Sequence, residues 1–263
     1  MLRGLYSAAN AMRYRVHEVE TIANNLANVS TDGYKRDRIA MRSFGDMLLS
    51  RIEQHPENTS DNTQVPPRIG VLNLGGPIAE SEYVDFTPGA PRTTGNPLDI
   101  YIDGPGFFVV ETPAGERYTR NGSFTFNDEG TIVTSDGYTV QGANGGELRI
   151  IDPAPFSINS NGDILQNGLP IGQLRIVEFP DISVIEKDGA TLFRMVDNTQ
   201  PQPYTAQGST VEQGAVESSN VDAIRALVRL ISAQRSYEAA ARAVDMFNQS
   251  LQRVSTELGS LPA

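Results

Sequence analysis

The sequence predicts a mixed α and β fold, with long N- and C-terminal helices that form a coiled-coil-like pair. Between them we expect an inserted, mainly antiparallel β domain, built as a sandwich or an irregular barrel. Three observations support this: apolar residues recur at helical spacing at both ends of the chain, the spacing changes to alternation in the middle, and Gly-containing turn signals divide the middle into short segments. With 263 residues, the chain is long enough to bury a core.

The N-terminal segment carries an unbroken 3-4 apolar spacing, which is typical of a coiled-coil seam. Its charged residues fall off this seam, as a side facing solvent or a partner requires. Residues 28 to 33 supply Asn and Gly for a C-cap and a turn, so we expect a helix of roughly 27 residues and about 40 Å. The seam consists of Leu2, Leu5, Ala9, Met12, Val16, Val19, Ala23 and Leu26.

The C-terminal segment repeats the pattern, and no Gly or Pro interrupts residues 215 to 258. Ser218-Ser219-Asn220 offers an N-cap, and an uninterrupted helix of roughly 38 residues would span about 57 Å. A helix of that length needs a partner along it. Its apolar positions are Ile224, Leu227, Val228 and Ile231, and later Tyr237, Ala241, Val244, Phe247, Leu251, Val254 and Leu258.

Between the ends, Leu98, Ile100 and Ile102 alternate with Asp99, Tyr101 and Asp103, which places Asp99 and Asp103 on the solvent face of an expected strand. The turn at Gly104-Pro105-Gly106 leads into an apolar strand at residues 107 to 110. Further turn signals follow at roughly 8 to 12 residue spacing. We therefore divide the chain into an N-terminal helix (1–33), a connector (34–76), a β domain (77–212) and a C-terminal helix (213–263).

Composition and charge exclude several function classes. The chain has no Cys, which excludes disulfides, thiolate metal sites and a cysteine nucleophile. It has two His, His17 and His55, and neither has a visible orienting partner. The net charge of −11 argues against a nucleic-acid surface. Residues 56 to 215 contain 8 basic and 21 acidic side chains, a net charge of −13, whereas both ends are close to neutral.

Other patterns that could carry chemistry have simpler interpretations. Gly104-Pro105-Gly106 lacks the third glycine and the helix of a phosphate loop, which favours a hairpin turn. The alternating Asn159, Asn161 and Asp163 lack the closing acidic residue of a calcium loop, which favours an Asn-Gly hairpin. Asp99 and Asp103, four residues apart on a strand, lie ~13 Å apart, too far for a glycosidase pair. We therefore predict no catalytic, cofactor or metal site and no enzymatic activity.

The apolar seams are the remaining candidate functional surface. Such a stripe usually packs on the core of its own protein. Here the seams are long, and the terminal segments have little else to pack on, so a monomer would leave much apolar surface exposed. We therefore favour assembly with other subunits, through Leu2, Leu5, Met12, Val16, Val19 and Leu26 together with Ile224, Leu227, Ile231, Tyr237, Val244 and Leu251.

Three ordered motifs resemble the signatures of the bacterial flagellar basal-body rod and hook proteins. The first covers residues 23 to 36, with Asn24, Asn25, Asn28 and Gly33. The last covers residues 216 to 222 and 233 to 238, with Asn220, Arg235, Tyr237 and Glu238. The central motif covers residues 103 to 110 and 118 to 124. The chain length is similar to that of the distal-rod proteins and short for a hook protein.

This resemblance implies a structural subunit of the basal body, outside the cytoplasmic membrane. Such subunits pass through the flagellar type III export apparatus and polymerise helically with themselves and with other rod and hook proteins. Their helices form the inner tube and their β domain forms the outer layer. Phe44 and Leu48 are similar to the family's export motif, and Asn24, Asn25 and Asn28 are either helix C-caps or inter-subunit hydrogen-bonding residues. Two alternatives remain open, a secreted β-rich binding module or carbohydrate-active enzyme and a phage-tail-like tube protein.

Overall fold

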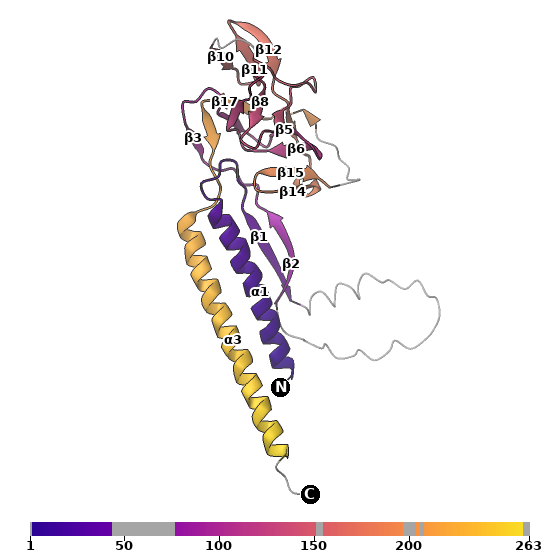
Figure 1. Cartoon of the computed structure of the whole chain (residues 1–263), viewed down its shortest axis with the longest axis vertical. Helices are drawn as coiled ribbons and strands as arrows, with labels where there is room; N and C mark the ends of the chain where they lie inside the picture. Colours follow the sequence, from indigo (N-terminus) through magenta and orange to yellow (C-terminus); the bar gives the residue numbers. More distant parts are fainter. Residues whose placement is uncertain (1, 44–76, 151–154, 197–203, 206–207, 260–263) are drawn as a thin grey trace, which may run out of the picture. The chain divides into compact units, whose positions relative to one another are not determined.

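The computed structural model describes residues 2–43, 77–150, 155–196, 204–205 and 208–259 (Figure 1). The chain divides into two compact units. The helical unit comprises Met1–Leu26, Asp37–Tyr83 and Asp222–Ala263, and the β unit comprises Ala27–Arg36 and Val84–Val221. The chain therefore passes between the two units four times.

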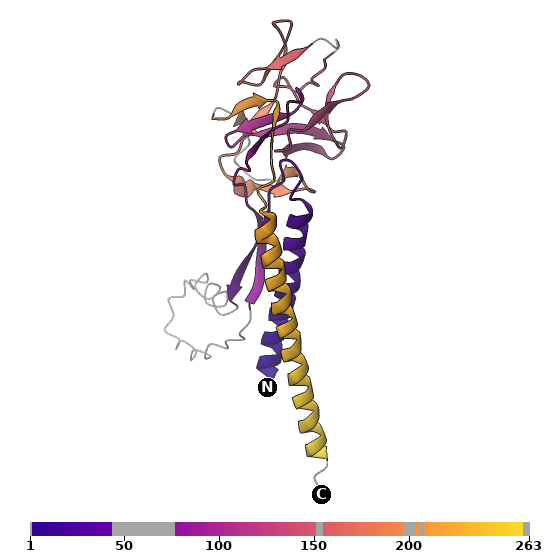
Figure 2. The ribbon, with the colours of Figure 1, turned by 90° about the vertical axis from the view of Figure 1, so that its left-hand side faces the viewer.

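Two long helices make up most of the described helical unit, α1 (Leu2–Ala27) with 26 residues and α3 (Ala223–Gly259) with 37 residues. They run side by side in opposite directions in both views of the ribbon (Figures 1 and 2). Both lengths agree with the helices that the apolar spacing predicts. Within the described residues, no helix has a stretch long and apolar enough to cross a bilayer.

The apolar residues of α3 belong to two different faces. Ala226 and Ala233 are buried, whereas Ile224 and Ile231 are 76% and 50% exposed. Tyr237 follows Ile231 by six residues, which places the two side chains about 120° apart around the helix axis. The apolar pattern therefore changes face at this point. The face that is buried or half-buried follows a 4-3 spacing, through Ala226, Leu230, Ala233, Tyr237, Ala240, Val244, Phe247 and Leu251.

One side of α1 contacts a two-stranded sheet of the same unit, β1 (Asp37–Ser43) and β2 (Pro77–Val84). The Thr21 hydroxyl donates to a carboxylate oxygen of Glu82 over 3.0 Å. The Asn25 side chain donates to the carbonyl of Asp37 and accepts from its N–H, both over 2.8 Å. The polar side of α1 thus faces this sheet, and the apolar stripe through Met12, Val16 and Val19 lies on other sides of the helix.

The β unit consists of short strands, and every pair with a defined register in it is antiparallel. Its main sheet has the order β14-β15-β6-β5-β9-β8-β7, with β13 pairing with β5 and β16. Smaller sheets are β10-β11-β12, β17-β4 and β18-β3. The main sheet ends at β14 and β7, so the described strands form no closed barrel and the barrel alternative is wrong.

The strands of the β unit have the following bounds: β3 (Pro91–Thr93), β4 (Ile100–Asp103), β5 (Phe107–Thr112), β6 (Gly115–Thr119), β7 (Phe124–Phe126), β8 (Ile132–Thr134), β9 (Thr139–Val140), β10 (Phe156–Ile158), β11 (Asp163–Gln166), β12 (Leu169–Gln173), β13 (Ile176–Glu178), β14 (Ile185–Lys187), β15 (Leu192–Met195), β16 (Tyr204–Thr205), β17 (Thr210–Gln213) and β18 (Ala215–Glu217). A short 3-10 helix, η1 (Ile182–Val184), precedes β14.

Strand β5 lies at the centre of the β unit because both of its faces are covered. Phe108 and Val110 belong to one hydrophobic cluster, with Ile132 and Val140 among its members. Phe107 and Val109 belong to a second cluster, which also contains Phe193. Alternate residues of a strand point to opposite faces. The apolar run that the sequence predicts as a strand is therefore confirmed, and it is buried on both sides.

Two expectations for this region are wrong. Asp99 is buried, where its carboxylate accepts hydrogen bonds from Thr94 over 2.5 Å and Asn96 over 3.0 Å; it therefore organises the preceding turn and is not on a solvent face. The turn at Gly104 to Gly106 is not a hairpin, because β4 pairs with β17 while β5 pairs with β6. The hairpin at residues 159 to 163 is confirmed, since β10 and β11 pair around it.

Candidate functional site

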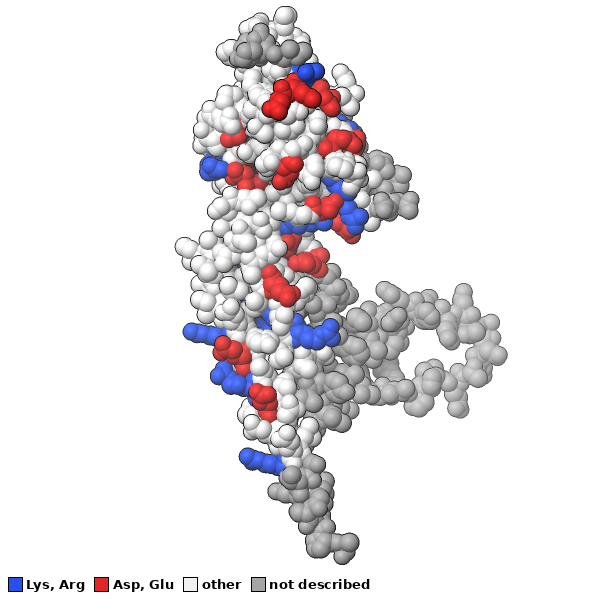
Figure 3. Space-filling model, viewed as in Figure 1, with Lys and Arg blue, Asp and Glu red and all other residues white. Residues whose placement is uncertain are grey.

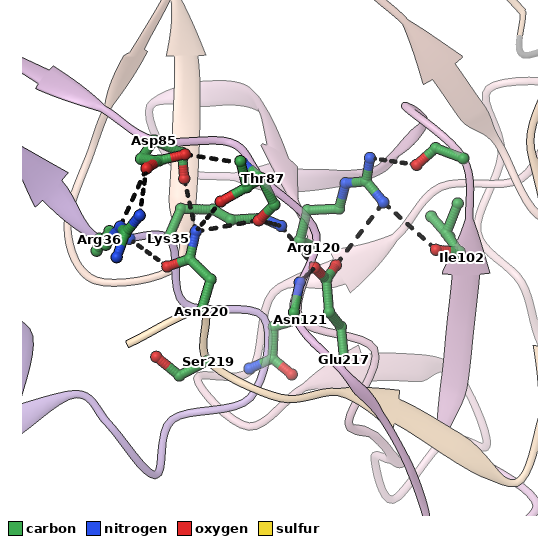
Figure 4. Close-up of polar contacts among 12 residues, drawn as sticks. Lys35, Arg36, Asp85, Thr87, Ile102, Arg120, Asn121, Glu217, Ser219 and Asn220 are labelled. Carbon is green, nitrogen blue, oxygen red and sulfur yellow. Dashed lines mark hydrogen bonds and ion pairs between the residues drawn. The ribbon is translucent and has the colours of Figure 1, made fainter. Parts of the chain in front are cut away.

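Three segments far apart in the sequence meet in the β unit, at residues 33–36, 120–122 and 217–220 (Figure 4). We call this cluster, together with residues 85–89, the polar junction. The first segment follows α1 and the last precedes α3. Every segment of the polar junction belongs to the β unit, so its geometry is defined within one compact body.

The carboxylate of Glu217 is the centre of the polar junction. It accepts hydrogen bonds from the Lys35 ammonium over 2.5 Å and from the backbone N–H of Gly89 over 2.6 Å. Its other oxygen lies 3.7 Å from the Arg120 guanidinium. Figure 4 shows both cations converging on this one carboxylate. All three charged side chains are at most 5% exposed.

Burial changes the titration of both cations. Desolvation lowers the pKa of Lys35, and the charge and hydrogen bond of Glu217 oppose that shift. Desolvation likewise lowers the pKa of Arg120, again opposed by Glu217. Removing water from two cations is costly, and one shared carboxylate compensates it only in part. The polar junction therefore depends on Glu217 more than on any other of its charged groups.

Arg120 is held on several sides. Its guanidinium donates to the carbonyl of Gly104 over 2.6 Å and to that of Ile102 over 3.4 Å, and it lies 4.9 Å from the centre of the Phe107 ring. Its Nε is the one buried side-chain polar atom without a hydrogen-bond partner in the described part of the chain. Arg120 thus links the polar junction to the second hydrophobic cluster.

The side-chain amide of Asn220 binds two other segments of the polar junction, residues 33–36 and residues 85–89. Its oxygen accepts from the backbone N–H of Arg36 over 2.8 Å, and its nitrogen donates to the carbonyls of Asp85 over 2.7 Å and Thr87 over 3.0 Å. The Arg36 guanidinium in turn donates to the Asp85 carboxylate over 2.8 and 3.0 Å. Asn220 therefore does not cap α3 as predicted, because its amide is used in these long-range contacts.

The N-cap of α3 is Asp222 instead. This helix begins at Ala223, and the Asp222 carboxylate accepts from the N–H of Arg225 over 3.1 Å. Such a bond satisfies one of the free N–H groups of the first turn. The prediction of a cap at residues 218 to 220 therefore begins the helix too early.

Glycine is required where the segments cross most closely. Gly33 has a φ of +70°, and a Cβ placed on it would lie 2.3 Å from the backbone nitrogen of Asn121. A Cβ on Gly89 would lie 1.8 Å from the carbonyl oxygen of Ser218. The N–H of Gly33 donates to the carbonyl of Glu217 over 2.7 Å. Backbone therefore packs directly on backbone at the polar junction.

Acid should weaken the polar junction through Asp85. Burial raises the pKa of Asp85, but hydrogen bonds from Arg36 and Thr87 outweigh it and bring the pKa below its ordinary value. A lowered pKa stabilises the fold above the unfolded value of about 3.9, and this contribution is lost as the pH falls through the folded value. We expect Asp85→Asn to remove part of the acid dependence of urea unfolding between about pH 5 and pH 2. Asp128→Asn, in an exposed turn, is the control, and equal acid dependence in both variants would contradict the assignment.

The sequence-predicted assembly residues lie at different levels of exposure. On α1, Met12, Val19 and Leu26 are half-buried and Val16 is 40% exposed. On α3, Leu227 is 46% exposed, like its exposed neighbours Ile224 and Ile231, whereas Tyr237, Val244 and Leu251 are half-buried on the other face. The side chains of Leu2 and Leu5, and all of Phe44 and Leu48, lie outside the described residues.

The family-motif residues lie in different parts of the structure. Gly33 and Asn220 belong to the polar junction, and Asn25 binds β1. Asn28 lies past the end of α1, where its side-chain oxygen accepts from the Thr31 hydroxyl over 3.3 Å. The remaining members of the motifs, Asn24, Arg235, Tyr237 and Glu238, lie on the two helices.

Sequence reasoning missed Lys35, Asp85, Arg120 and Glu217 as site residues. Three of them stand inside the motifs that carry the resemblance, as the charged members of Tyr34-Lys35-Arg36, Thr119-Arg120-Asn121 and Val216-Glu217-Ser218. The available signal was therefore a charged residue inside each of three separate motifs.

Three families of flagellar proteins match separate parts of this chain. Residues 5–35 match the family "Flagella basal body rod protein", residues 101–193 match "Flagellar hook protein FlgE/F/G D1 domain", and residues 212–257 match "Flagellar basal body rod FlgEFG protein C-terminal". Lys35, Arg120 and Glu217 each come from a different one of these matched regions.

Relatives match over nearly the whole chain. The flagellar basal-body rod protein FlgF of Caulobacter vibrioides is 34% identical over 247 residues, which cover 93% of each chain. FlgG of the same organism is 33% identical over 97% of this chain and 98% of its own. FlgG of Bacillus subtilis is 32% identical over the same shares of the two chains. These matches confirm the resemblance that the motifs indicate, and the chain belongs to the family of flagellar basal-body rod proteins.

Proposed function

We propose that this chain, a structural subunit of the flagellar rod, assembles with copies of itself into a helical, hollow shaft that transmits torque. Its family membership makes it a rod subunit of the basal body, outside the cytoplasmic membrane. The terminal helices form the inner tube, and the β domain, residues 77–212 in the division of the sequence, forms the outer layer.

The exposed apolar face of α3 is the observation that carries this proposal. Ile224, Leu227, Val228 and Ile231 follow one another along one side of the helix and are 46% to 76% exposed. Figure 3 shows no Lys, Arg, Asp or Glu at the left margin where α3 begins in this view, while charges of both signs follow lower down. Adjoining exposed apolar side chains on a helix mark an interaction surface.

We further propose that α1 and α3 pair as a coiled coil within the subunit. The 4-3 spacing of the face through Ala226 and Ala233 is that of a coiled-coil seam. The small side chains at both positions allow a close approach of helix backbones. This arrangement leaves the face through Leu227 and Ile231 for a neighbouring subunit, so that α3 serves two contacts with two faces.

The other rod and hook proteins are the expected neighbours along the shaft, and the flagellar type III apparatus is the expected export route. Phe44 and Leu48 remain the proposed export motif on their sequence pattern. The role is structural and needs no catalysis, in keeping with the relatives' names, which describe rod and hook-basal body proteins.

Replacing Ile231 by Asp should block self-assembly without unfolding the subunit. Ile231 is 50% exposed, so a carboxylate there remains hydrated in the monomer but would be buried in a filament. We expect at least a tenfold rise in the concentration at which filaments form, measured by sedimentation and electron microscopy. Circular dichroism should be unchanged.

Asn248→Asp is the matched control, because Asn248 is an exposed polar residue of the same helix, about 25 Å along the axis from Ile231 and about 100° around it from the proposed surface. It should assemble as the natural sequence does. Normal filaments from Ile231→Asp would contradict the proposed surface. A wild-type chain that stays monomeric at high concentration would contradict assembly of this rod subunit with copies of itself.

A further inference from the structure

We propose that the first and last segments of the β unit dock cooperatively through Glu217, so that neither segment stays docked when the other leaves. We call this arrangement the lock. The N-terminal arm is residues 27–36, and the C-terminal arm is residues 215–221. The proposal deepens the proposed function, because these arms continue into the helices that form the shaft. Only its consequence for assembly rests on that function, because the docking of the two arms is a property of the monomer.

The charges of the polar junction are the first reason for cooperativity. Lys35 of the N-terminal arm is 1% exposed, and its ammonium binds Glu217 of the C-terminal arm. If the C-terminal arm leaves, Lys35 and Arg120 lose their shared carboxylate. If the N-terminal arm leaves, Glu217 loses the nearer of its two cations. A charge that stays buried without its partner is strongly destabilising, so half-docked states are rare.

Backbone contacts between the arms are the second reason. The N–H of Gly33 donates to the carbonyl of Glu217 over 2.7 Å, and the N–H of Asn220 donates to the carbonyl of Tyr34 over 3.4 Å. The side chain of Asn220 accepts from the N–H of Arg36. These bonds alternate in direction along the two arms. Each arm therefore satisfies the buried polar groups of the other, which are costly to leave unpaired.

Each arm also has anchors of its own on the rest of the β unit. Lys187 of β14 donates to the carbonyl of Lys35 over 2.8 Å, and its ammonium lies 3.9 Å from the centre of the Tyr34 ring. On the other side, β18 pairs with β3, and the N–H of Ser218 donates to the carbonyl of Ala90 over 3.0 Å. Separate anchors allow each arm to be loosened by itself, which makes the lock testable.

In assembly, the lock means that a subunit has either both arms docked or both arms free. A subunit with one arm loose would offer its neighbours an incomplete surface.

Hydrogen exchange in the dilute full-length chain tests the lock through Lys187→Ala. This change loosens the N-terminal arm at a contact that involves Tyr34 and Lys35. The reporters are the amides of Tyr34, which bonds to Thr31 within its own arm, and Ser218, which bonds to Ala90. We expect exchange of both to rise by the same factor, about tenfold, with the Ile132 amide of β8 unchanged. A rise at Tyr34 alone would overturn the proposal.

Glu217→Gln tests the same lock at its centre. It keeps the shape of the side chain and removes the shared charge, so exchange at Tyr34 and Ser218 should rise together by about 100-fold or more. Glu178→Gln is the matched control, because Glu178 is also a buried Glu of this unit but accepts from Gly208 and Ser209 and acts on Arg120 only through its charge. It should raise exchange at both reporters far less than Glu217→Gln. A rise at Ser218 alone in Glu217→Gln, or no rise at either amide, would overturn the lock. Because exchange is measured on the monomer, failure to form filaments would leave this result standing.

Discussion

Phe107→Ala is expected to lower the free energy of unfolding of the β unit by about 4 kcal/mol, the range for emptying the site of a buried aromatic ring. The Phe107 ring is 1% exposed and contacts three other rings, with centres 5.7 to 5.8 Å away, those of Phe86, Phe179 and Phe193. It also lies under the guanidinium of Arg120. The substitution therefore opens a cavity in the second hydrophobic cluster and removes one support of the polar junction.

Phe126→Ala is the matched control for this prediction. The same atoms are removed, but Phe126 is 37% exposed and its ring pairs with that of Phe156, 6.0 Å away. Its cost should be about 1 kcal/mol. Urea unfolding followed by circular dichroism measures both variants. Equal losses would contradict a larger contribution of the buried Phe107 ring to the stability of the fold.

Gly33→Ala should cost about 3 kcal/mol or more, for two separate reasons. The φ of +70° at Gly33 is unfavourable for a residue with a Cβ. That Cβ would also lie 2.3 Å from the backbone nitrogen of Asn121, which cannot move without moving Arg120. Because Gly33 donates to the carbonyl of Glu217, we also expect the substitution to loosen both arms.

Gly137→Ala separates the cost of the positive φ from the cost of the steric clash. Gly137 has a similar φ of +85°, but nothing lies within 4 Å of the place of its Cβ. This variant should lose only the conformational part, about 1 kcal/mol. The difference between the two losses of unfolding free energy, measured in urea, then reports the close approach of backbones at the polar junction. A difference near zero would contradict that approach.

The sequence was sufficient to predict the elements whose signal is local. The 3-4 spacing predicts both helices, supported for α3 by the absence of Gly and Pro from residues 215 to 258, and the apolar run at residues 107 to 110 predicts the buried strand. The Asn-Gly turn at residues 159 to 163 follows equally from local chemistry, because the Asn159 side chain accepts from the N–H groups of Asn161 and Asp163.

The features that the sequence could not predict depend on partners far along the chain. Asn220 is a good N-cap by type, but the N–H of Arg36, 184 positions away, uses its side-chain oxygen. Asp99 fits an alternating strand, but Thr94 and Asn96 fold back onto it. The exposed and buried faces of α3 depend on where its neighbours lie, which no spacing within the helix specifies.

The division of the chain into two units also determines the order in which the units can fold. The β unit is complete at Val221, because its last segment is the C-terminal arm, whereas the helical unit needs Asp222 onward to gain α3. A chain that emerges with its N-terminus first, from a ribosome or from a channel, can therefore finish its sheets before its second long helix exists. The exposed apolar face of α3 follows the β unit in the chain, so the sheets can form before the surface most prone to premature association has emerged.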